Sequence, residues 1–255
     1  MAALQSYQHL LETSRRVNWH LEDLVGEGRR LDFTRPFLPE TFAQTEPLGF
    51  LSPAEKLKLN QIRARGYLAL FELLEAFVVP FISAQADDGA AAEPFRAHAL
   101  RHFACEEEKH RQLFSTGTVK DNQDLDPQFR SLLKHHWIEE AQHARLDGLV
   151  LKSHAQRSSA QDIATAIQEY FEIGAFLDAG FKQQAELDLK ALERAIRRTL
   201  SEDERRQIFE LQHRALCWTF LGSAMENRNF LAALASISDD AAARVEQAAK
   251  SFIMH

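Results

Sequence analysis

The sequence predicts an all-α protein built as a bundle of long helices, and three observations lead to this fold class. Apolar residues recur at helical spacing over most of the 255 residues. The 10 glycines and 7 prolines fall mainly outside these periodic stretches, which favours uninterrupted helices. Two segments, Ser52-Pro53-Ala54-Glu55 and Ser201-x-x-Glu204, have the serine-to-glutamate spacing of a capping box and therefore predict helix starts.

The helices follow in order from these patterns. A short helix over 3–16 precedes an irregular arm over 17–52, in which prolines punctuate aromatic and aliphatic residues. Long helices are expected after the arm, at about 53–85, 93–115, 127–156, 159–199 (with a bend at Gly174 or Gly180), 201–227 and 239–252. A polar stretch over 115–126 separates the second and third of these.

Length and composition indicate a single domain, 1–255, of a soluble globular protein, with 45% hydrophobic and 26% charged residues. It divides into an N-terminal helix and arm (1–52), a central bundle (53–199) and C-terminal helices (200–255). The net charge of −7, with short basic clusters among acids, argues against a nucleic-acid-binding surface. No apolar run approaches 18 residues, so we expect no membrane segment and a cytoplasmic setting. Cys105 and Cys217 lack CxxC spacing, which argues against a disulfide framework or zinc knuckle.

Two Glu-x-x-His motifs carry the chemical signal, Glu107-x-x-His110 and Glu140-x-x-His143. Residues three apart share a face of a helix, and at about 100° per residue both motifs fall on the apolar side. One such motif is more often a surface pair. A buried carboxylate, however, costs several kcal/mol unless it is paired, neutralised or metal-bound. Two facing motifs predict a dinuclear metal site, to which two other helices each add a carboxylate.

The other helices offer candidates for these carboxylates. In the helix over 53–85, Glu75 lies within the apolar arc and Glu72 at its edge, so Glu75 is the expected ligand and Glu72 the alternative. In the helix over 159–199, Asp178 falls on the inner face and is the candidate fourth carboxylate, with Glu172 as the alternative. Asp178 could equally have a capping or outer role.

Two further residues share the face of the second motif. His136 lies one turn before Glu140 and is the expected third histidine ligand, although a lone core histidine is more often only hydrogen-bonded. Asp147, one turn past His143, could accept the imidazole N–H of that ligand and orient it. The predicted metal ligands are Glu75, Glu107, His110, His136, Glu140, His143 and Asp178.

The set of Glu75, Glu107-x-x-His110 and His136-x-x-x-Glu140-x-x-His143 resembles the ferritin-like non-haem di-iron superfamily. Over about residues 60–155 it is most similar to p-aminobenzoate N-oxygenase-type enzymes, in which a third histidine comes from the last motif. The resemblance implies a ferritin-like bundle and oxidation of a small organic molecule such as an amine. The family order has a further Glu-bearing helix before that motif. Here the 25 residues between His110 and His136 contain no glutamate, so Asp178 or a water completes the site, or it is incomplete.

Carboxylate and imidazole ligands suit iron or manganese, and the lack of thiolates among them argues against structural zinc. We therefore expect an oxidoreductase with two Fe ions, or Mn or mixed Mn/Fe. Its partners would be dioxygen, an electron donor and a small-molecule substrate. A ferritin-like iron-binding or ferroxidase protein and a metal-free bundle acting through partners are the alternatives. The arm and the helices after 200 favour the enzyme, because extra elements can cover a pocket. The C-terminal helices could also form a homodimer.

Overall fold

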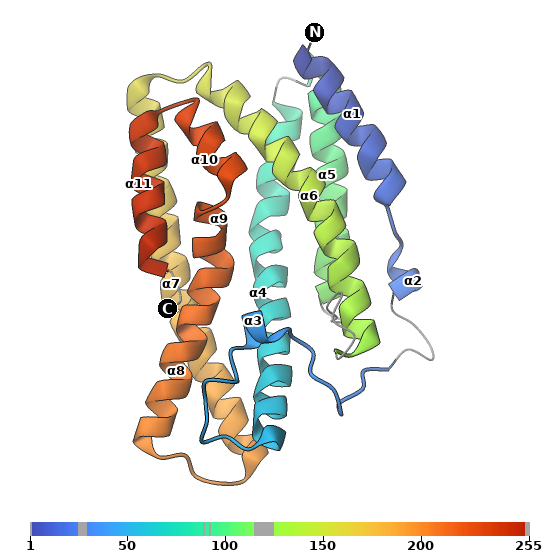
Figure 1. Ribbon diagram of the computed structural model, residues 1–255. Helices are drawn as coiled ribbons and strands as arrows, with labels where there is room; N and C mark the ends of the chain where they lie inside the picture. The colour runs from blue at the N-terminus through green and yellow to red at the C-terminus, as the bar shows by residue number, and fades with distance from the viewer. Residues whose placement is uncertain (1, 25–29, 89, 92, 115–124, 253–255) are drawn as a thin grey trace. The chain divides into compact units, whose positions relative to one another are not determined.

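The computed structural model describes residues 2–24, 30–88, 90–91, 93–114 and 125–252 (Figure 1). Helices make up 81% of it and the described residues contain no strand, which confirms the all-α class. The helices are α1 (Ala2–Val17), α2 (Leu21–Leu24), α3 (Glu40–Ala43), α4 (Pro53–Asp87), α5 (Pro94–Phe114), α6 (Pro127–Ala155), α7 (Ala160–Ile196), α8 (Glu202–Cys217), α9 (Ser223–Met225), α10 (Arg228–Ala235) and α11 (Asp239–Ala249).

The long helices begin at the predicted caps. At the start of α4, the Ser52 backbone N–H donates to Glu55 Oε2 at 2.8 Å and the Glu55 N–H donates to Ser52 Oγ at 3.4 Å. Ser201 and Glu204 form the same reciprocal pair at the start of α8, and a third capping box opens α7. Each box satisfies backbone N–H groups that the first helical turn leaves without partners. Both predicted capping boxes are therefore confirmed.

Helical residues run without a break from Glu202 to Met225, as expected of the helix over 201–227, but the segment after it is not a short turn. A π-helical turn over Trp218–Gly222 follows α8 directly, and α10 occupies most of the expected turn. A Cβ on Gly222 would stand 2.7 Å from the Trp218 ring and 2.8 Å from Phe252 Cβ, so this close approach requires glycine. The predicted polar stretch over 115–126 lies outside the described residues, except for Leu125 and Asp126.

The chain divides into two compact units. The first contains Met1–Phe37 and Ala64–Leu149, where α1 runs along α5 (Figure 1) and Trp19, Leu24 and Leu132 form a buried cluster. The second contains Leu38–Arg63 and Val150–His255, where α7 packs against α8 and α10 against α11. The helix expected as the fourth member of the central bundle, α7, belongs to this second unit.

Of the helices described, α4 alone is long and apolar enough to cross a membrane by length and composition, and 28% of its apolar window is buried. The same helix carries the buried carboxylate of Glu75, and core helices of soluble proteins meet the same criterion.

Candidate metal centre

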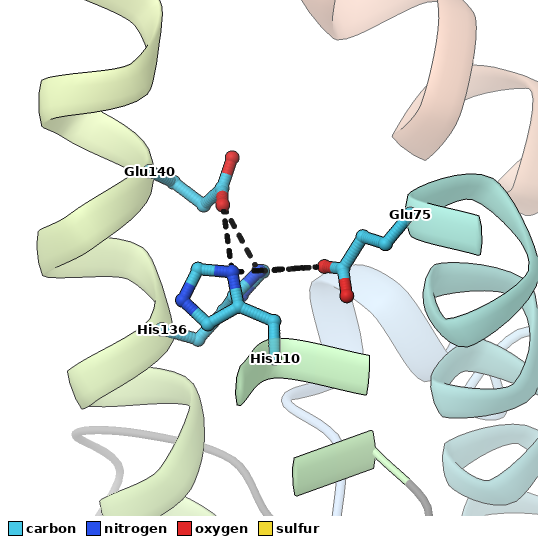
Figure 2. Close-up of side chains that lie close together, drawn as sticks. All are labelled: Glu75, His110, His136 and Glu140. Atoms are coloured by element: carbon cyan, nitrogen blue, oxygen red, sulfur yellow. Dashed lines mark ion pairs between the residues drawn. The ribbon is translucent and has the colours of Figure 1, made fainter. Parts of the chain in front are cut away.

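Six of the seven predicted ligands come together in the first unit, from three helices. They are Glu75 on α4, Glu107 and His110 on α5, and His136, Glu140 and His143 on α6. They form two overlapping groups, Glu75/His110/His136/Glu140 and Glu107/His110/Glu140/His143. In each group the ligand atoms lie within 4.8 Å of one another. Figure 2 shows the first group, with side chains from α4, α5 and α6 pointing toward one another.

Glu140 belongs to both groups through one oxygen atom. Its Oε1 lies 3.3 Å from His110 Nδ1, 3.3 Å from His136 Nε2 and 3.0 Å from His143 Nδ1 (Figure 2 shows the first two). A carboxylate in this position contacts donor atoms on both sides. This is where a dinuclear centre in a helical bundle needs a bridging carboxylate.

Glu75 and Glu107 each serve one group. Glu75 Oε1 lies 3.4 Å from His136 Nε2 and 3.8 Å from His110 Nδ1. Glu107 Oε1 lies 2.9 Å from His143 Nδ1, and its Oε2 lies 3.6 Å from His110 Nδ1. The two groups therefore have one carboxylate apiece in addition to Glu140.

Aromatic side chains hold the imidazole rings. Trp19 stacks on His110 with ring centroids 6.1 Å apart, and Phe71 meets His136 edge-on at 5.2 Å. The ring of Phe103 lies 4.0 Å from that of His143. These apolar contacts limit the rotation of each imidazole and keep its inner nitrogen directed at the carboxylates.

Two further carboxylates, which the sequence analysis did not single out, contact the outer nitrogens of the histidines. His143 Nε2 lies 3.1 Å from Glu106 Oε2, and His110 Nε2 lies 2.8 Å from Glu139 Oε2. Each carboxylate comes from the helix opposite its histidine and directly precedes the glutamate of a Glu-x-x-His motif. The doubled glutamates, Glu106-Glu107 and Glu139-Glu140, were the signal available in the sequence.

The outer carboxylates have their own partners. The Ser14 hydroxyl on α1 donates to Glu106, and His102 Nδ1 lies 3.4 Å from the same carboxylate. Lys109 Nζ donates to Glu139 Oε1 at 2.6 Å and lies 4.1 Å from the centroid of the Trp19 ring. Buried carboxylates are tolerated when they are paired in this way.

Burial and pairing act in opposite directions on the pKa values of the cluster. Burial alone would lower the pKa of His110 and His143. Their hydrogen bonds to glutamates outweigh burial and raise both pKa values well above the usual range. Burial raises the pKa of Glu75 to about 7. In the protein without metal, protons on imidazoles therefore provide positive charge beside the carboxylates.

The donor set fits metal ions. Glu75, Glu107 and His143 are at most 5% exposed, and Glu75 Oε2 is buried without a hydrogen-bond partner among the residues described. An unsatisfied buried carboxylate oxygen costs free energy that a bound cation would recover. Carboxylate oxygens and imidazole nitrogens are ligands that iron and manganese accept.

The Glu140 side chain is 35% exposed, whereas Glu75 and Glu107 are almost fully buried. Trp137, one turn earlier on α6, is 68% exposed.

The other predicted residues lie elsewhere. Glu72 and Asp147 are exposed, and the His143 nitrogen that Asp147 was expected to contact faces Glu106. Asp178 belongs to neither Glu/His group. It pairs with Lys182, His213 and Cys217 in the second unit. Its alternative, Glu172, is exposed and accepts a hydrogen bond from Gln168.

No protein-family model, no curated protein and no solved structure matches the chain. We therefore infer the function from the residues of the site.

Proposed function

We propose that the chain is a non-haem dinuclear iron oxygenase or oxidase that oxidises a small organic molecule. The observation that carries this proposal is the shared position of Glu140, whose Oε1 contacts nitrogen atoms of His110, His136 and His143. Two overlapping ligand groups around one carboxylate are what a dinuclear centre requires.

Each side chain has a defined part in this proposal. Glu75 and His136 would hold one ion, Glu107 and His143 the other, and Glu140 both, while His110 lies within reach of either. Glu106 and Glu139 accept hydrogen bonds at the Nε2 atoms of His143 and His110. A proton kept on Nε2 leaves the Nδ1 lone pair free to bind a cation. When bound, the two irons would supply the electron transfer to dioxygen that accompanies substrate oxidation.

The partial exposure of Glu140 and the exposed ring of Trp137 support an apolar or aromatic substrate. Trp137 offers an exposed ring on the same helix, one turn before the shared carboxylate. An aromatic ring of a substrate could stack on Trp137 while its polar group faces Glu140. A small aromatic amine has this combination and is also what the family resemblance implies.

Metal stoichiometry tests the centre. Purified full-length protein, loaded anaerobically with ferrous iron and desalted, should retain about two irons per chain. Glu107→Gln should lose most of this iron because it removes a buried ligand. Glu108→Gln is the matched control, since its side chain is 46% exposed and pairs with Arg111. Wild-type protein that retains no iron would rule out the proposal.

Dioxygen uptake tests the reaction. Ferrous-loaded wild-type protein mixed with air-saturated buffer and aniline should consume dioxygen and yield oxidised amine, measured by an oxygen electrode and mass spectrometry. Glu107→Gln should do neither, and Glu108→Gln should do both. Rapid iron oxidation without amine oxidation in a panel of aromatic amines would favour the ferroxidase alternative instead.

A further inference from the structure

Asp178, His213 and Cys217 form a second cluster of metal-ligating side chains, in the second unit. Asp178 lies on α7, while His213 and Cys217 lie one turn apart on α8, which packs against α7. Asp178 Oδ1 is 2.7 Å from His213 Nε2 and 3.2 Å from Cys217 Sγ. Cys217 Sγ is also 3.2 Å from His213 Nε2. One oxygen, one nitrogen and one sulfur atom therefore lie within 3.2 Å of one another.

This arrangement differs from that of a catalytic cysteine activated by histidine. In such a site the imidazole uses one nitrogen for the thiol and the other for the carboxylate. Here the thiol and the carboxylate both face Nε2 of His213, so the ring does not bridge them.

We propose that Asp178, His213 and Cys217 bind a single zinc ion. Thiolate sulfur, imidazole nitrogen and carboxylate oxygen are the three ligand types that zinc takes in proteins. Ligand atoms about 2.0–2.3 Å from a tetrahedral zinc lie about 3.3–3.6 Å from one another, so the cluster needs to widen by only about 0.3–0.7 Å. This proposal is independent of the dinuclear centre, which lies in the other unit.

The surroundings hold the three donor atoms in place. Phe209 stacks on His213 with ring centroids 6.0 Å apart and fixes the plane of the imidazole. Lys182 Nζ donates to the outer oxygen of Asp178, Oδ2, at 2.6 Å, so Oδ1 is the oxygen that faces the cluster. The π-helical turn over Trp218–Gly222 begins directly after Cys217, and such turns occur frequently at functional sites.

The cluster is partly exposed on the side of Asp178. Cys217 is only 4% exposed, whereas the Asp178 side chain is 29% exposed and that of His213 is 18% exposed. A water molecule can therefore reach the cation from the side of Asp178. Three protein ligands and one open position are typical of zinc sites that act on a bound molecule.

Cobalt(II) titration of the full-length protein tests this site, because cobalt replaces zinc and reports on thiolate binding by a charge-transfer band in the near ultraviolet. The dinuclear centre has only nitrogen and oxygen donors and gives no such band. We expect the band in wild-type protein and its loss on adding zinc. Cys217→Ser should abolish it, and Cys105→Ser, which changes the exposed second cysteine, should retain it.

Two further variants keep the test decisive if Cys217→Ser does not fold, as judged by circular dichroism. His213→Gln should weaken cobalt binding at least about tenfold, since loss of even an outer partner of a metal ligand costs that much. Lys182→Gln should also weaken binding, by up to about tenfold, because it removes the outer partner that turns Asp178 Oδ1 toward the cluster. Absence of the band in wild-type protein, or its loss in Cys105→Ser alone, would overturn the proposal.

Discussion

At the scale of single residues, the outer carboxylates decide how the two inner histidines present their lone pairs. Glu106 and Glu139 contact Nε2 of His143 and His110 from the opposite helices. Replacing either carboxylate with an amide removes the charge that holds the proton on Nε2. We expect Glu106→Gln and Glu139→Gln each to weaken ferrous iron binding about 10- to 100-fold, as measured by competition with a chromogenic chelator.

The same measurement on Glu72→Gln supplies the control, because Glu72 is an exposed glutamate of α4 one turn before Glu75. Its iron affinity should match that of the wild type. Equal affinities in wild-type protein, Glu106→Gln and Glu139→Gln would show that these carboxylates do not orient the ligands.

At the scale of elements, the first part of α4 is tied to α7 by a buried ion pair. Arg63 Nη1 lies 3.5 Å from Asp188 Oδ2, and these side chains are 1% and 4% exposed. Arg63→Met leaves the Asp188 carboxylate buried without its cation, which typically costs about 3–5 kcal/mol. Urea unfolding at pH 8, followed by circular dichroism, should show this loss. Arg65→Met changes an exposed arginine of the same helix and should lose little stability.

The loss in Arg63→Met should depend on pH. Burial raises the pKa of Asp188 from 3.8 to about 6, and Arg63 opposes that rise. Because the folded pKa exceeds the unfolded one, the stability this group contributes is complete below pH 3.8 and is lost as the pH rises through 6. The difference in the free energy of unfolding between the wild type and Arg63→Met should therefore be small at pH 4 and should reach about 3–5 kcal/mol at pH 8. A difference in the free energy of unfolding that stays the same at both pH values would contradict this explanation. So would a double variant, Arg63→Met/Asp188→Leu, that does not recover the stability lost in Arg63→Met.

At the scale of the whole molecule, local signals predicted most of the fold. The capping boxes at Ser52 and Ser201 act within one helical turn, so both helix starts could be placed from sequence. The 100° rotation per residue placed Glu75, Glu107 and Glu140 on inward faces because their neighbours on those faces are apolar. In agreement with this prediction, six of the predicted ligands lie together in the structure.

What the sequence left open depends on which helix covers each face. Glu106 lies about 100° from Glu107 around α5, and that flank is buried because Ser14 on α1 contacts it. Asp178 lies on the inner face of α7, as expected, but the helix opposite this face is α8. Helical periodicity identifies a buried face without identifying its partner, so Asp178 could be placed on a face but not in a cluster.

The division into two units gives the metal a local effect on stability. The predicted ligands lie in α4, α5 and α6 of the first unit, so ferrous iron at about 100 times its Kd should stabilise that unit by about 2.7 kcal/mol. Anaerobic hydrogen exchange with mass spectrometry should show about 100-fold slower exchange for the most protected amides of α5 and of residues 127–149. Amides of α10 and α11 should change little, and Glu107→Gln should remove the gain. Equal slowing in both units would contradict a stabilising effect confined to the first unit.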